Sequence, residues 1–196
     1  MKLPGMRLRT IRPAFALGLL VSLAAVACGD SGKETDMSSG PALDPALLLP
    51  RVEARLAAIE PTMIEVRHDI HRHPELSGQE SRTAGLVADR LREAGFDVRT
   101  GVGGHGVVAR LTAPRPGRSV GVRADMDAVR SNAHDPADFR SETPGVRHIC
   151  GHDIHTTTAL AAALALAAVQ TDLAGSVVFY FQPAEENVTG AWAMLH

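Results

Sequence analysis

The stretch that decides the fold is residues 155–181, HTTTALAAALALAAVQTDLAGSVVFYF. Its first part, residues 155–169, is strongly apolar and rich in alanine, which predicts a buried helix. Residues 176–181 follow as a short run of Val, Phe and Tyr, which is typical of a buried strand. A buried helix followed directly by a buried strand predicts an α/β fold, with a sheet layered by helices.

The preceding sequence shows the same two kinds of element. Apolar residues recur at helical spacing from Leu48 to Ile70 and from about Glu80 to Ala94. Within the first of these stretches, Pro61 is expected either to kink the helix or to start a second one. Strand-like runs come next, at residues 96–100, 106–111 and 119–123. The predicted fold class is therefore α/β, with a mixed sheet layered by helices.

Residues 1–28 have the pattern of a secretion signal. Four basic residues in the first twelve positions precede an uncharged run that ends at Cys28. This run is shorter than the roughly 20 residues that a membrane-spanning helix needs. Because small residues precede Cys28, the segment resembles a lipoprotein signal in which Cys28 is lipidated; the alternative is an ordinary signal cut after Ala27. We expect an exported protein, periplasmic or an outer-membrane lipoprotein, that contacts a membrane only through this anchor.

Residues 29–45, GDSGKETDMSSGPALDP, are small, polar and rich in turn-forming residues, so we expect a flexible linker before a folded domain at 46–196.

The charge of the chain outside the signal limits its partners. Outside the signal the chain carries 16 basic and 22 acidic side chains. Nucleic-acid binding favours a basic surface, so this balance argues against nucleic acid as a partner.

The densest group of chemically reactive side chains is HICGHDIH, residues 148–155. Its thiol, imidazole and carboxylate groups are those that bind zinc and related ions. The alternative is a polar loop whose cysteine is merely buried and whose histidines cap the following helix. We favour metal binding because so many such groups at the mouth of an apolar helix are costly for stability alone.

Two pairs of carboxylates each follow a predicted strand. Glu185 and Glu186 are adjacent, and such neighbours repel each other unless a cation holds them. One of them suits a metal ligand and the other a general base, although a solvated helix start is the alternative. Asp125 and Asp127 point to the same side of an extended segment. They suit ligands or partners of a ligating histidine, unless they only stabilise a loop.

Three further histidines lie in RHDIHRHPE, residues 67–75. Their number suggests a second group of metal ligands. For His68, His71 and His73 we nevertheless favour a polar helix end that packs near the site.

Four motifs together carry a resemblance to a known family. In chain order they are HRHPELS (71–77), VRADMDAV (122–129), HICGHDIH (148–155) and FYFQPAEENVTGA (179–191). The set resembles the metal-dependent amidohydrolase family of hippurate hydrolase and indole-3-acetyl-amino-acid hydrolase, from about Val52 onward. The resemblance implies a zinc-peptidase-like catalytic domain that hydrolyses amide bonds of N-acyl amino acids or small peptides, as an aminoacylase or carboxypeptidase does. It also implies two divalent metal ions, which could be zinc, manganese or cobalt.

The resemblance also implies roles for single residues. It gives Cys150, His152 and Glu186 as metal ligands and Glu185 as the general acid and base. Asp127 matches an aspartate that orients the site in related metallopeptidases. Asp125 stands where those relatives carry a ligating histidine, so its role is left open.

Two departures from the family concern specificity and length. Arg130 and the loop at 131–147 replace a sequence in which many members have an early proline, and we expect this loop to border the substrate.

Members continue beyond the fourth motif with a lid or dimerisation domain and two further histidine ligands. We therefore expect an incomplete fragment that is inactive in isolation, with a homodimer as an option for the full-length form. The alternative function is a non-catalytic surface lipoprotein that binds a metal ion or peptide.

Overall fold

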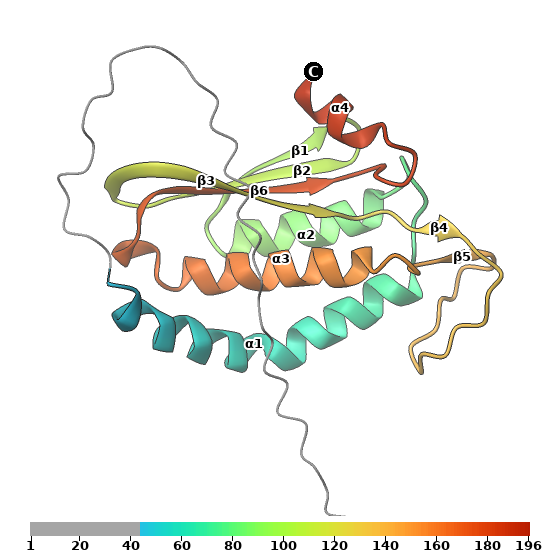
Figure 1. The fold of residues 1–196 in the computed structure, drawn as a ribbon, viewed down its shortest axis with the longest axis horizontal. Coiled ribbons are helices and arrows are strands. Elements are labelled where there is room, and N and C mark those ends of the chain that lie inside the picture. Colours follow the sequence, from blue (N-terminus) through green and yellow to red (C-terminus); the bar gives the residue numbers. More distant parts are fainter. Residues whose placement is uncertain (1–43) are drawn as a thin grey trace, which may run out of the picture. The chain divides into compact units, whose positions relative to one another are not determined.

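The computed structural model describes residues 44–196 (Figure 1). The signal segment, Cys28 and most of the expected linker lie outside the described residues. The described helices are α1 (Pro45–Arg72), α2 (Ser81–Glu93), α3 (His152–Ala167) and α4 (Gly190–Leu195), with a short 3-10 turn at Gln170–Asp172. The strands are β1 (Asp97–Val102), β2 (Gly106–Thr112), β3 (Arg115–Asp125), β4 (Val129–Arg130), β5 (Val146–Arg147) and β6 (Ala174–Gln182). None of the helices in this part of the chain is long and apolar enough to cross a membrane.

Four of the strands form one mixed sheet in the order β1-β2-β6-β3. Strand β6 pairs antiparallel with β2 and parallel with β3. Figure 1 shows α1, α2 and α3 on one side of this sheet and α4 on the other. The predicted α/β class, with a mixed sheet layered by helices, is therefore confirmed.

Helix α1 runs without a break through Pro61. Asp44 caps its first turn, because the Asp44 carboxylate accepts a hydrogen bond from the Ala46 N–H at 2.9 Å. Of the two expectations for Pro61, the start of a second helix is not realised. The buried face repeats at helical spacing and carries Ile59, Met63, Val66 and Ile70.

The centre of the core lies where α3 packs on the sheet. Leu160 and Ala163 of α3 are fully buried, as are Phe179 and Phe181 of β6. The small side chains of Ala159, Ala163 and Ala165 on buried positions of α3 let the helix approach its neighbours closely, while the two phenylalanines of β6 fill the space between helix and sheet. This packing holds the N-terminal end of α3 in place against the sheet.

That end of α3 lies at the same edge of the sheet as the carboxyl ends of β3 and β6. Because β3 and β6 are parallel, Asp125 stands opposite Gln182 at their ends. Parallel strands bring the residues that follow them to one edge, which is where α/β folds commonly place their sites. The topology thus brings together three segments that are distant in the sequence: 125–127, 150–155 and 182–186.

Candidate metal centre

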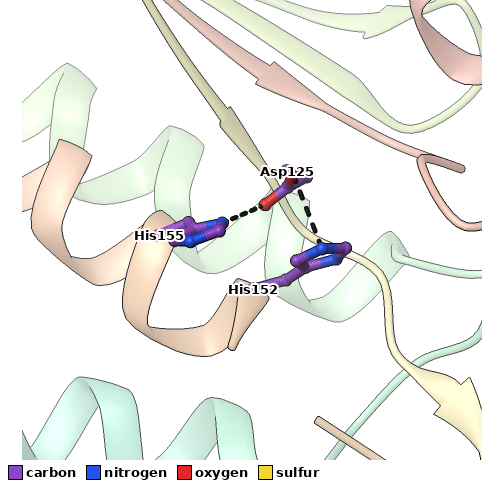
Figure 2. Close-up of side chains that lie close together, drawn as sticks. All are labelled: Asp125, His152 and His155. Atoms are coloured by element: carbon purple, nitrogen blue, oxygen red, sulfur yellow. Dashed lines mark hydrogen bonds and ion pairs between the residues drawn. The ribbon is translucent and has the colours of Figure 1, made fainter. Parts of the chain in front are cut away.

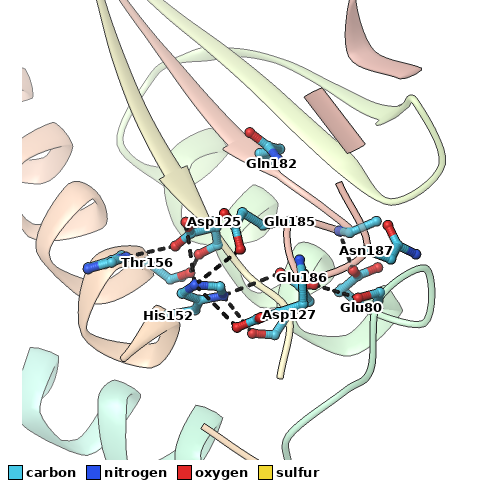
Figure 3. A network of polar contacts seen from close by, with 12 residues as sticks. Glu80, Asp125, Asp127, His152, Thr156, Gln182, Glu185, Glu186 and Asn187 are labelled. Carbon is cyan, nitrogen blue, oxygen red and sulfur yellow. Dashed lines mark hydrogen bonds and ion pairs between the residues drawn. The ribbon is translucent and has the colours of Figure 1, made fainter. Parts of the chain in front are cut away.

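His152, the first residue of α3, lies at the centre of the cluster (Figure 3). Its Nδ1 lies 2.9 Å from the main-chain oxygen of Asp127 and 3.3 Å from Oδ1 of the same residue. Nδ1 therefore donates a proton to Asp127, so that in the neutral ring the lone pair is on Nε2. A histidine held in this way is oriented to bind a cation through Nε2.

The free nitrogen of His152 faces three carboxylates. Its Nε2 lies 3.5 Å from Asp125 Oδ2, 3.7 Å from Glu185 Oε2 and 3.7 Å from Glu186 Oε1. These distances leave room for an ion between the groups. Two sets of potential ligands result, with ligand atoms within 4.8 Å of one another: Asp125, His152 and His155, and His152, Glu185 and Glu186. Imidazole and carboxylate donors fit zinc, manganese or cobalt.

The surrounding carboxylates change the protonation of His152. Burial alone would lower its pKa, but the hydrogen bond to Asp127 and the charge of Asp125 outweigh burial and raise the pKa to about 9. Without an ion, a proton on His152 thus takes part of the role that a cation would have. The raised pKa shows that this position favours positive charge.

Asp127 connects the cluster to two other parts of the chain. Its Oδ2 accepts hydrogen bonds from Ser77 Oγ at 2.7 Å and from the Glu186 main-chain N–H at 2.9 Å. Burial would raise the pKa of Asp127, but hydrogen bonds from His152, Ser77 and Glu186 lower it to about 2. A carboxylate that stays ionised and is held on several sides suits the predicted orienting role.

Asp125 contacts both histidines at the start of α3 (Figure 2). Besides His152, it contacts His155, whose Nδ1 lies 2.8 Å from Asp125 Oδ1. Arg123 forms a 2.7 Å ion pair with the other oxygen of Asp125. The sequence left the role of Asp125 open and gave His155 a supporting role, and the structure places both in one potential ligand set with His152.

Cys150 lies beside these ligand sets and belongs to neither of them. Its side chain is exposed, and Gly151 follows it in a left-handed conformation, φ 86°, which glycine adopts without strain. A hydrogen bond with Glu186, burial, and the charges of Glu186 and Glu185 raise the pKa of the thiol to about 11. Cys150 can bind a metal only as a thiolate, so its predicted role requires the ion to displace this proton.

Asp153 belongs to neither ligand set and contacts side chains of α1 instead. Its Oδ2 lies 2.9 Å from Nδ1 of the buried His71, whose Nε2 lies 3.1 Å from Asp135 Oδ2. His71 therefore links α1 and α3 to the loop at 131–147. His71 thus lies in the last turn of α1 and packs near the site, as expected of a polar helix end.

His148 lies in the same buried layer, 6.3 Å from His71 between ring centres. Neither of its ring nitrogens has a hydrogen-bond partner among residues 44–196. Burial lowers its pKa to about 4, so His148 is neutral near neutral pH. It adds no positive charge that would compete with a cation.

An oriented imidazole surrounded by carboxylates is the donor set of a metal-dependent hydrolase. Comparison with known proteins agrees with this class. Residues 121–196 match the family model described as Peptidase family M20/M25/M40. The chain is 43% identical to hippurate hydrolase of Campylobacter jejuni over 67% of its own length and 34% of that protein. It is 39% identical to N-acyl-L-amino acid amidohydrolase of Geobacillus stearothermophilus over 67% of its length and 36% of that protein.

A solved structure agrees as well. The chain superposes on a Bacillus subtilis protein, described as a dinuclear metal binding peptidase from the M20 family, with a TM-score of 0.67 and 35% identity. This match covers 71% of the present chain and 39% of the other. The resemblance to this family of amidohydrolases and peptidases is therefore confirmed over the matched part of the chain. It spans about a third of the length of the curated relatives it matches.

Proposed function

We propose that the protein is a metal-dependent amidohydrolase that acts on N-acyl amino acids or small peptides. The observation that carries this proposal is the geometry of His152, with Nδ1 tied to Asp127 and Nε2 facing three carboxylates at 3.5 to 3.7 Å. The substrate class is supported by the relatives, which include a hippurate hydrolase and an N-acyl-L-amino acid amidohydrolase. The substrates that these two names give, hippurate and N-acyl-L-amino acids, are both cleaved at an amide bond.

The residues that would hold two divalent ions are His152 and Glu186, with Cys150 as the predicted third ligand and Asp125 as a further candidate. When bound, such ions polarise the scissile carbonyl and lower the pKa of water towards neutrality. The chain's own contribution is orientation. Asp127 fixes the tautomer of His152, and its Oδ2 holds the main chain of Glu186 at 2.9 Å.

Glu185 is the proposed general base and acid. Its side chain is 39% exposed, so a substrate can reach it, and it lies 3.7 Å from His152 Nε2. A carboxylate in this place can take a proton from the attacking water and later give it to the leaving amine. Glu186 is less exposed and lies closer to Cys150, which suits a ligand more than a base.

We also propose that the protein is exported, as a periplasmic or outer-membrane lipoprotein lipidated at Cys28. The support is the pattern of residues 1–28, a basic start followed by a short apolar run and small residues before the cysteine. Radiolabelled palmitate incorporated by the wild type and lost in Cys28→Ser is the expected result. A Cys28→Ser protein that is still labelled would refute lipidation at this residue.

Exchange of Glu185 tests the proposed activity, with the protein expressed from its complete reading frame. Glu185→Gln is expected to lower kcat on N-acyl amino acids by about 10² to 10⁴-fold while metal content stays unchanged, because only proton transfer is removed. Glu186→Gln is the matched control, and it should lose metal as well as activity. A near-normal rate in Glu185→Gln would remove Glu185 from the base role. A wild type that binds metal but cleaves no N-acyl amino acid or peptide would favour the non-catalytic alternative.

A further inference from the structure

The segment between α1 and α2, residues 73–80, contacts the site. Of its residues, only Ser77 has been given a part in the site so far. Leu76 forms a parallel bridge with Ala128, just after Asp127. Ser77 donates its hydroxyl hydrogen to Asp127 at 2.7 Å. The side chain of Glu80 follows and belongs to the same polar network (Figure 3), where it reaches the main chain of Ala184 after β6. This segment therefore contacts the loop after β3 as well as the turn after β6.

Glu80 stands at the N-cap position of α2 but does not cap the helix. The capping is done by Glu75, whose carboxylate accepts the main-chain N–H groups of Arg82 at 2.9 Å and Thr83 at 2.8 Å. Glutamate is also not among the residues that N-cap positions favour. The needs of helix α2 thus do not explain why residue 80 is a glutamate.

The Glu80 side chain is completely buried and binds a distant main-chain group instead. Its Oε1 accepts the N–H of Ala184 at 2.7 Å and that of Gly78 at 2.9 Å. Oε2 has no hydrogen-bond partner, and Glu80 forms no ion pair within residues 44–196. Burying a carboxylate without a cation is unfavourable. The contact of Glu80 with Ala184 is therefore expected to serve a purpose that offsets this cost.

Ala184 is the residue just before Glu185, and its backbone is in the left-handed region with φ 50°. This conformation disfavours any residue with a Cβ atom, so the surroundings have to hold it. On the other side, the Ala184 main-chain oxygen accepts the N–H of Gly190 at 3.1 Å. Glu80 fixes the N–H of the same residue. The direction in which the chain leaves Ala184 decides where Glu185 and Glu186 point.

We propose that Glu80 is a positioning residue that aims Glu185 and Glu186 at His152 by holding the Ala184 N–H. The inference rests on the proposed function, since it assumes that these two glutamates serve a metal centre. A partner that orients ligands in this way is typically worth 10- to 100-fold in metal affinity or activity.

Two matched exchanges separate positioning from stability. Glu80→Met and Glu75→Met each replace a carboxylate that accepts two main-chain N–H groups by a side chain of similar size that accepts none. Only Glu80→Met frees the turn at Ala184. Zinc affinity is measured by competition with a chromophoric chelator. The values of kcat and KM are measured with an N-acyl amino acid as substrate, and the exchange rate of the Ala184 amide hydrogen is measured by NMR.

Glu80→Met is expected to speed exchange at Ala184, weaken zinc binding about 10- to 100-fold and lower kcat more than it changes KM. Glu80→Gln keeps an oxygen for Ala184 and should stay within about threefold of the wild type, an estimate based on the retained acceptor. Glu75→Met should lower thermal stability but leave zinc affinity and kcat unchanged. Wild-type zinc affinity in Glu80→Met, or an equal loss in Glu75→Met, would overturn the inference. All variants are made in the protein expressed from its complete reading frame. A wild type of this form that binds zinc but hydrolyses nothing refutes the proposed function, while the zinc and exchange measurements still decide on Glu80.

Discussion

Metal binding to the metal-free protein is expected to strengthen steeply as the pH rises. The pKa of His152 is about 9 and that of the Cys150 thiol is about 11, so both carry a proton between pH 6 and 8. Each of them has to release its proton to become a ligand. If both bind, affinity should rise about 100-fold per pH unit, or about 10⁴-fold from pH 6 to pH 8. If His152 alone binds, the rise is about tenfold per unit.

The slope can be measured directly and assigned to residues. Zinc affinity is determined at several pH values by chelator competition, and proton release is counted by calorimetry in buffers of different ionisation enthalpy. Cys150→Ser should reduce the slope by one proton if Cys150 is a ligand, and Cys28→Ser is the control that leaves it unchanged. A pH-independent affinity would refute the assignment of His152, and an unaltered slope in Cys150→Ser would refute that of Cys150.

Three further predictions concern stability and the turn after β6. The metal-free protein should be most stable near pH 6.5. Its free energy of unfolding should fall by about 3 kcal/mol on acidification to pH 4, because His148 takes up a proton in the unfolded state at a higher pH than in the folded state. It should fall by a similar amount between pH 6.5 and pH 9, because the unfolded state releases the proton of His152 while the folded state still holds it. Chemical denaturation at several pH values measures both losses. Leu160→Ala should lower the free energy of unfolding by about 3 kcal/mol, and a loss under 1 kcal/mol would contradict its place in the core. In Gly190→Ala the new Cβ would lie 1.6 Å from the Pro183 oxygen, so kcat should fall about 10²-fold; an unchanged kcat would show that the turn can shift freely.

The main elements could be predicted because their patterns are local. The apolar spacing of residues 48–70 and 80–94 matches α1 and α2, and the short apolar runs match the interiors of β1, β2, β3 and β6. The polar start of β3, from Arg115, was not predicted, because its side chains are mostly exposed and lack an apolar pattern. The strand order was also out of reach, because it depends on contacts between distant segments.

The site residues also fall into those that a local sequence pattern reveals and those that it does not. Cys150, His152, Glu185 and Glu186 stand out because each lies in a dense run of reactive groups. Glu80 does not, because its importance comes from a hydrogen bond to a residue 104 positions away. The Asp125–His155 contact likewise joins residues that are 30 positions apart. No local pattern reports such pairs, so a single sequence does not reveal them.

The place of β6 in the sheet has a consequence for the newly made chain. β6 comes last of the four strands in the sequence, yet it lies between β2 and β3. Until residues 174–182 have left the ribosome, β2 and β3 each expose an unpaired edge, and such edges invite aggregation. We therefore expect the nascent chain to need chaperone protection during this interval. The metal centre cannot form earlier either, because the insertion of β6 brings Glu185 and Glu186 to His152.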